Sequence, residues 1–112
     1  MPKRPDRCHL ETAFRVMGRS CKALVLFELF RGVARFNQLQ RTLPGVTPRT
    51  LSRTLKELER DGLVAKTTWP GNLPKTEYRL TETGKTLRPI IDAMQRWGGD
   101  YTARTEIATR SS

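Results

Sequence analysis

The chain has 112 residues, a formal net charge of +10 and a hydrophobic content of 37%. The length predicts a single domain, residues 1–112, and the apolar content excludes a disordered chain without a packed core. No apolar run approaches the roughly 18 residues of a transmembrane helix, and the first ten residues are polar and basic, so we expect neither membrane insertion nor secretion.

The first half of the chain predicts four helices separated by short turns. We expect them from about Arg7 to Gly18, from Cys21 to Gly32, from about Asn37 to Thr42, and from Pro48 to Arg60. Glycine suits the C-terminal ends of the first two, and Ser20 is a suitable N-cap for the second. Thr47 and Pro48 suit the N-cap and first position of the fourth. The second helix is apolar nearly all round, which is typical of a central core helix.

The second half changes to an alternating pattern and then returns to helix. Residues 63–69 and 76–80 alternate in polarity on either side of a turn-rich loop, which predicts a β-hairpin. Trp69 falls among the inward residues of that alternation. Thr81 then caps one last helix with an apolar stripe that reaches Tyr101. We expect residues 1–6 to be flexible because Pro2 and Pro5 prevent a helix from starting much before Arg7, and residues from about 103 to 112 because they have no apolar periodicity.

The fourth predicted helix separates leucines from cations. At about 100° per residue, Leu51, Leu55 and Leu58 share one face, and four cations lie opposite them: Arg49, Arg53, Lys56 and Arg60. Residues 31–60 carry seven basic and two acidic residues, whereas residues 89–112 carry three of each. A solvated surface is the alternative, but exposed helices usually mix charges and gain stability from it. The pattern therefore favours a helix that faces nucleic acid.

The order of the predicted elements also indicates nucleic-acid binding. A short helix, a tight turn, a helix with a basic face and a basic hairpin together predict a winged helix-turn-helix. The fold class is thus α+β, mainly α. An RNA reader would offer more aromatic stacking platforms near the hairpin. The predicted contacts with double-stranded DNA are Thr47, Arg49, Thr50, Ser52, Arg53, Lys56, Arg60, Lys66, Asn72, Lys75 and Arg79.

Several stretches resemble one known family. They are FNQLQRTLPGVTPRTLSRTLKEL, DGLVAKT, PKTEYRLTETG and LRPIIDAMQRWG, together with Cys8 before the first helix. They resemble the HxlR-type bacterial winged-helix transcription regulators, relatives of the MarR group. The resemblance implies a homodimer that binds inverted-repeat operators. The chain departs from the family pattern at Arg19-Ser20-Cys21, where Gly-Lys-Trp is common, and at Trp69, where Tyr or Phe is commoner.

The resemblance also implies that the first and last helices form the dimer. The apolar stripe and the zero net charge of residues 89–112 agree with this, although the stripe is also compatible with packing on its own domain. The predicted interface is Leu10, Phe14, Leu87, Ile90, Ile91, Met94, Trp97 and Tyr101.

We expect the two cysteines to have different roles. Cys8 matches the family's N-terminal cysteine, and nearby positive charge favours the reactive thiolate, so Cys8 is a candidate redox sensor. A structural cysteine at the dimer interface is the alternative. Cys21 lies on an apolar helix and is expected in the core. With His9 they are too few for a structural zinc site, and we expect no metal, cofactor or catalytic residue.

The combined prediction is a dimeric bacterial transcriptional regulator in the cytoplasm, with a small-molecule or redox effector. Two alternatives stay open: a winged-helix module that binds an acidic protein, and a basic RNA-binding protein. The first would prefer no DNA sequence, and the second would bind RNA more tightly than duplex DNA.

Overall fold

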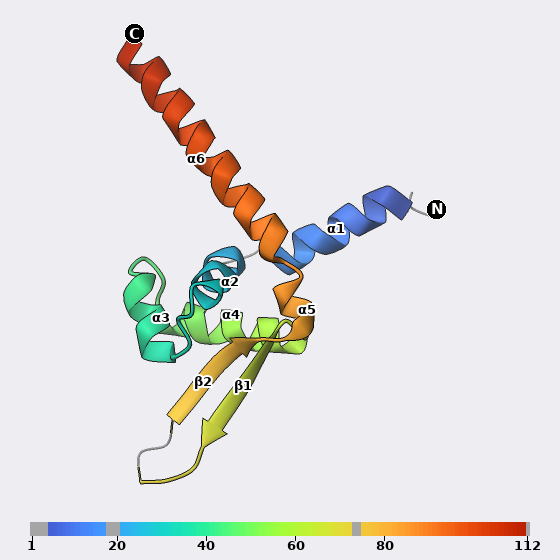
Figure 1. The fold of residues 1–112 in the computed structure, drawn as a ribbon, viewed down its shortest axis with the longest axis vertical. Helices are drawn as coiled ribbons and strands as arrows, with labels where there is room; N and C mark the ends of the chain where they lie inside the picture. Colours follow the sequence, from blue (N-terminus) through green and yellow to red (C-terminus); the bar gives the residue numbers. More distant parts are fainter. Residues whose placement is uncertain (1–4, 18–20, 73–74, 112) are drawn as a thin grey trace.

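The computed structural model describes the backbone of residues 5–17, 21–72 and 75–111, and the side chains of residues 9–17, 21–72 and 75–106. The elements are α1 (Pro5–Met17), α2 (Lys22–Phe30), α3 (Phe36–Thr42), α4 (Pro48–Arg60), β1 (Val64–Trp69), β2 (Lys75–Leu80), α5 (Glu82–Lys85) and α6 (Arg88–Ser111). Figure 1 shows the hairpin and α6 projecting from the helical body in opposite directions. This arrangement confirms the predicted, mainly helical winged helix-turn-helix.

The core forms around α2, as its nearly continuous apolar sequence predicts. Val25 and Leu26 of α2 are fully buried, and so is Leu39 of α3. Leu51, Leu55 and Leu58 bring the predicted face of α4 into the same core, each at most 1% exposed. The leucine face of α4 thus fixes which of its sides remains in solvent.

The ends of the helices follow local sequence signals where the structure describes them. α1 begins at Pro5, slightly before the predicted start, because proline is tolerated in the first turn of a helix. Cys21 occupies the N-cap position of α2; the predicted cap Ser20 and terminator Gly18 lie outside the described residues. Gly62 ends α4 with a φ of 76°, a left-handed conformation that glycine adopts without strain.

The hairpin pairs Val64 with Leu80 and Trp69 with Lys75 at its two ends. Trp69 therefore lies on the face opposite Val64, and 48% of its surface is exposed. The prediction that Trp69 points inward is wrong, because β1 extends past the core before it reaches residue 69. The other edge of β2 is also paired: the Tyr78 N–H donates to the Ala34 carbonyl at 2.8 Å.

The last predicted helix is two helices. Thr81 caps α5 as expected, accepting from the Gly84 N–H at 3.0 Å. A continuous helix would drive the ring of Pro89 into the Lys85 carbonyl, so the chain breaks between them before α6 begins. Gly84 packs so closely that an added Cβ would collide with the Leu63 carbonyl oxygen.

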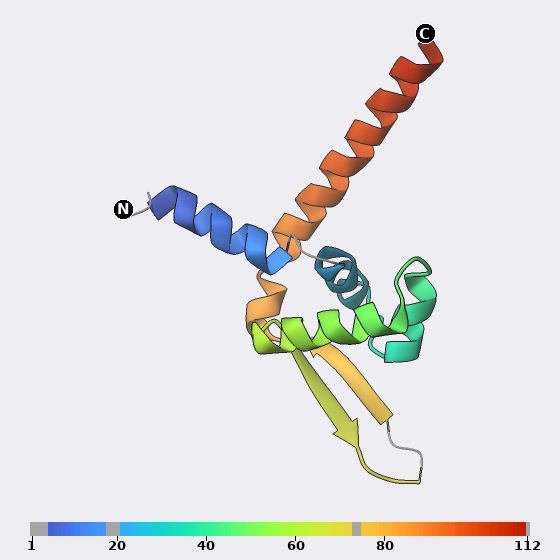
Figure 2. The same ribbon diagram turned by 180° about the vertical axis from the view of Figure 1, so that it is seen from behind.

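α1 and α6 extend away from the body in both views (Figures 1 and 2). The backbone of α6 remains helical to Ser111, well past Tyr101, where the apolar stripe ends. None of the helices in the described part of the chain is long and apolar enough to cross a bilayer.

Candidate nucleic-acid interface

The four cations of α4 all lie on its outer side. Arg49, Arg53, Lys56 and Arg60 are exposed, while the leucines opposite them are buried. Within the described residues none of the four forms an ion pair. The nearby acid Glu57 turns inward, toward Lys22 of α2. These cations, the basic face of α4, therefore form a positive surface that has no ion-pair partner among the described side chains.

The N-terminus of α4 is closed by a pair of threonines. The Thr47 hydroxyl accepts from the Thr50 N–H at 3.1 Å and donates to the Thr50 hydroxyl at 3.0 Å. Thr50 and Ser52 are half-buried. Thr47 and Thr50 thus have a capping role within the chain, and Arg49 and Arg53 are the long side chains that reach outward from the first two turns.

The hairpin, hereafter the wing, carries the remaining predicted contacts. Lys66, Asn72, Lys75 and Arg79 are all exposed. The register divides the cations between two faces, because directly paired residues lie on the same side of a sheet. Lys66 pairs with Tyr78, whereas Lys75 pairs with Trp69 on the opposite face, which also carries Arg79. The wing therefore presents positive charge on both sides.

Sequence reasoning missed basic residues at the junction of α3 and the wing. Arg35 and Arg41 line a depression of about 420 Å³ together with Lys75. Arg35 is held there by an ion pair with Glu77, at 3.7 Å, and by a β-bridge to the same residue. Both arginines contribute to the excess of positive charge in residues 31–60, and this excess is the sequence feature that could have indicated them. Their proximity to the wing depends on the bridge, which no local pattern predicts.

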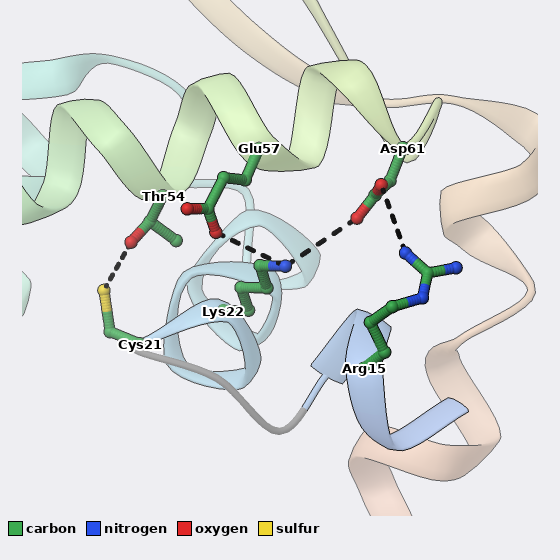
Figure 3. A network of polar contacts seen from close by, with 6 residues as sticks. All are labelled: Arg15, Cys21, Lys22, Thr54, Glu57 and Asp61. Atoms are coloured by element: carbon green, nitrogen blue, oxygen red, sulfur yellow. Dashed lines mark hydrogen bonds and ion pairs between the residues drawn. The ribbon is translucent and has the colours of Figure 1, made fainter. Parts of the chain in front are cut away.

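A polar network fixes α4 from beneath (Figure 3). The ammonium of Lys22, a residue only 5% exposed, lies 3.4 Å from Glu57 Oε2 and 3.7 Å from Asp61 Oδ2. Arg15 of α1 reaches Asp61 Oδ1 at 3.9 Å. Two cations and two carboxylates compensate one another, so the inner side of α4 carries no excess charge. The network joins α1 and α2 to the helix with the basic face.

Cys21 lies beside this network, where it was expected, in the core. It is 6% exposed, and its Sγ is 3.4 Å from the hydroxyl of Thr54 on α4. A buried free cysteine of this kind packs like a small apolar side chain. The side chain of Cys8, the candidate redox sensor, lies outside the described side chains, although its backbone belongs to α1.

Tyr78 lies on β2, and its side chain is buried, at 8% exposed. Burial raises the pKa of the Tyr78 phenol, and the negative charge of Glu59 raises it further. The phenol therefore stays protonated throughout the neutral range, and it adds no charge to the surface.

The predicted dimer residues divide into two groups. Ile91 is 4% exposed and belongs to the chain's own core, and Leu87 is partly buried and packs against that core. Both side chains therefore pack on their own domain, the alternative left open above for the apolar stripe; Ile91 follows the break after α5, which sets its direction. The other six form an exposed set, the apolar surface of α1 and α6: Leu10, Phe14, Ile90, Met94, Trp97 and Tyr101, between 44% and 71% exposed.

This apolar surface continues into a groove between α2 and α6. The groove has a volume of about 330 Å³ and is lined by Leu24, Phe27 and Met94, among others. Leu24 is 52% exposed and was not predicted as an interface residue. On α6 the rings of Trp97 and Tyr101 stack, with centroids 5.1 Å apart. Exposed apolar areas of this extent mark interaction surfaces.

Known proteins resemble the chain over most of its length. A family model described as HxlR-like helix-turn-helix matches residues 16–106. An HTH-type transcriptional regulator of Methanothermobacter thermautotrophicus is 42% identical over 88% of this chain and 76% of its own. The reduced form of the redox regulator HypR superposes with a TM-score of 0.81 at 37% identity, covering 87% of this chain and 96% of HypR. The reduced transcriptional regulator YodB from Bacillus subtilis has a TM-score of 0.71 at 31% identity, with coverages of 86% and 91%.

Proposed function

The chain belongs to the HxlR-like helix-turn-helix family of transcriptional regulators, and we propose that it binds double-stranded operator DNA as a cytoplasmic homodimer. One observation carries the proposal: the basic face of α4 is exposed and forms no ion pair within the described chain, and the wing extends beside it. An α-helix fits the major groove of B-DNA, and a hairpin alongside can reach the flanking backbone or the minor groove.

The described side chains have separate roles in this proposal. Arg49 and Arg53 reach base edges from the first turns of α4, where guanine offers two acceptors to an arginine. Thr50 and Ser52 approach the same groove, and Thr47 holds the end of the helix in place. The remaining side chains contact the phosphate backbone: Lys56, Arg60, Lys66, Asn72, Lys75 and Arg79 from the predicted set, with Arg35 and Arg41 added from the structure.

The dimer in this proposal is built from the apolar surface of α1 and α6. The groove between α2 and α6 is apolar and open, and Leu10 and Phe14 of α1 are exposed apolar side chains of suitable size to enter it from a second copy. Burial of such side chains is the main driving force of association. A two-fold axis would place two copies of α4 on half-sites about one helical turn apart.

Selection of bound duplexes from a random DNA pool tests the proposal. An enriched inverted repeat with half-sites about one turn apart is the expected result. The absence of any enriched sequence would contradict it and favour a protein-binding module, and tighter binding to RNA than to duplex DNA would favour an RNA-binding protein. Light scattering at the same protein concentration measures whether the chain is a dimer.

We propose in addition that this regulator responds to oxidants through Cys8. The support is the likeness to HypR, which is described as a redox regulator, together with the position of Cys8 near the N-terminus of α1, where positive charge favours a thiolate. Operator affinity should fall on treatment with diamide in the wild-type chain and stay unchanged in Cys8→Ser. Persistence of the loss in Cys8→Ser, with its disappearance in Cys21→Ala, would assign the response to Cys21 instead.

A further inference from the structure

A second concave surface lies away from the basic face of α4, where three parts of the fold meet. It is an open depression of about 470 Å³ between the end of α2, the end of β2 and the junction of α5 with α6. Its lining includes Phe30, Val33 and Leu80 as apolar residues and Arg79, Lys85 and Arg88 as cations. The volume falls in the usual range for small-molecule sites.

The charges around this depression are all positive. Arg79, Lys85 and Arg88 come from three different elements, β2, α5 and α6, and no acidic residue belongs to the lining. Lys85 has a partner in Glu82 at 3.1 Å, but the Glu82 side chain is 92% exposed and screened by water. Arg79 and Arg88 form no ion pair within the described residues. The depression therefore favours an anion.

The floor of the depression is apolar, and one cation is already oriented over it. The guanidinium carbon of Arg88 lies 4.7 Å from the centroid of the Phe30 ring. A stacked guanidinium keeps its N–H groups free at the edge of its plane, where they can bind a carboxylate in bidentate fashion. Phe30, Val33 and Leu80 are partly buried and pack against the core, so the apolar floor is held in place.

We propose that this depression binds a small organic anion, in which one carboxylate is attached to an aromatic or short aliphatic body. The carboxylate would bind Arg88, assisted by Lys85 and Arg79, and the body would cover Val33 and Leu80. A free phosphate or a phosphate of DNA satisfies the cations but leaves the apolar floor in water. The combination of cations and apolar surface therefore selects an amphipathic ligand over a simple anion.

Because of the position of the site, a bound ligand would affect DNA binding by the proposed regulator. Lys85 and Arg88 lie on either side of the break between α5 and α6, and Arg79 lies on the wing. A ligand held by all three would connect the start of α6 to the wing. This consequence for DNA binding depends on the proposed function, whereas binding of the ligand does not.

Titration of the protein with sodium benzoate, followed by amide chemical shifts in NMR, tests the binding step without DNA. Saturable shifts centred on Val33, Leu80 and Lys85 are expected. Benzamide, which has the same ring without the charge, and sodium phosphate, which has the charge without the ring, should each bind at least about tenfold more weakly, as expected for loss of charge-assisted hydrogen bonds or of the buried ring.

Each other outcome overturns the proposal. Equal affinity for benzamide means that the cations do not select the ligand. Equal affinity for phosphate means that the site is a simple anion site. Shifts that do not saturate, or that centre elsewhere, mean that the depression is not a binding site.

Two arginines on one helix provide a matched pair of variants. Arg88→Gln should weaken benzoate binding by about tenfold or more, while Arg104→Gln, an exposed position farther along α6, should leave it unchanged. Arg88 is exposed, so its replacement should preserve the fold, which circular dichroism checks. If Arg88→Gln does not fold, Lys85→Gln on α5 tests the same cationic rim. Unchanged benzoate affinity in a folded Arg88 or Lys85 variant would contradict the assignment.

Discussion

The ammonium group of Lys22 lies 3.4 Å from Oε2 of Glu57, almost entirely out of water, in the network that attaches α4 to α1 and α2 (Figure 3). This ion pair has a direct effect on the outer surface of the protein. It turns inward the one acidic side chain that the helical wheel places next to the basic face of α4. The cations of α4 form no ion pair with any side chain of the described chain.

Removal of Lys22 tests this network. Lys22→Met keeps the length of the side chain but leaves two carboxylates without their central partner. We expect the free energy of unfolding to fall by about 1–3 kcal/mol, less than for a fully enclosed pair, because Glu57 and Asp61 are partly exposed. Lys85→Met, which breaks an exposed pair with Glu82, should cost less than about 0.5 kcal/mol. If urea unfolding gave the same loss of unfolding free energy for Lys22→Met and Lys85→Met, burial of Lys22 would add nothing to the strength of its ion pairs.

Arg53→Ala tests recognition of bases by α4. Arg53 is exposed in the second turn and packs against no part of the core, so the substitution should leave stability unchanged. If Arg53 binds a guanine, the free energy of binding to the selected operator should weaken by about 1–3 kcal/mol, and the preference for guanine at that base pair should decrease. Fluorescence anisotropy on the operator and on a scrambled duplex measures both effects. The same loss on both duplexes would make Arg53 a phosphate contact.

The wing should contribute to affinity through phosphate contacts. Lys75→Ala should weaken binding to all duplexes similarly, and the slope of log affinity against log salt should become shallower by about one unit. Lys85→Ala, a lysine on α5 outside the predicted DNA contacts, is the matched control. A slope that stays the same in Lys75→Ala would remove the wing residue from the phosphate contacts.

The two tryptophans allow a paired test of the dimer. Trp97 on α6 is 67% exposed and Trp69 on the wing is 48% exposed. Trp97→Ala should weaken the dimer by about 2 kcal/mol or more, since large aromatic residues dominate interfaces, and Trp69→Ala should not. Sedimentation velocity over a range of concentrations measures this. An unaffected dimer in Trp97→Ala would place the interface elsewhere.

Tyr78 predicts a loss of stability in alkali. Its pKa is raised in the folded state by burial and then by Glu59, so the folded chain holds this proton more tightly than the unfolded chain does. The resulting stability is fully present below about pH 10 and is lost as the pH rises through the folded pKa. Tyr78→Phe should remove this part of the pH dependence in urea unfolding. Glu59→Gln should remove less of it, because burial is the larger cause.

Local signals in the sequence were sufficient to predict most of the helices and strands. Thr47 and Pro48 begin α4 because a side-chain acceptor and a fixed φ suit the start of any helix, whatever packs on it. The alternation of the hairpin and the leucine face of α4 are also local patterns. The break after α5 is a partial exception: the apolar stripe predicts one continuous helix, whereas the clash of the Pro89 ring with the Lys85 carbonyl divides it.

The amino-acid sequence by itself determined the order of the elements, the buried face of α4, the basic face opposite it and the family of the chain. Only the tertiary structure decided that Glu57 turns inward to Lys22, that Trp69 stays in solvent, that Arg35 joins the wing and that Ile91 enters the core. The reason is physical. Helix caps and periodicity depend on residues a few positions apart, whereas burial of one side chain depends on elements that meet only after folding.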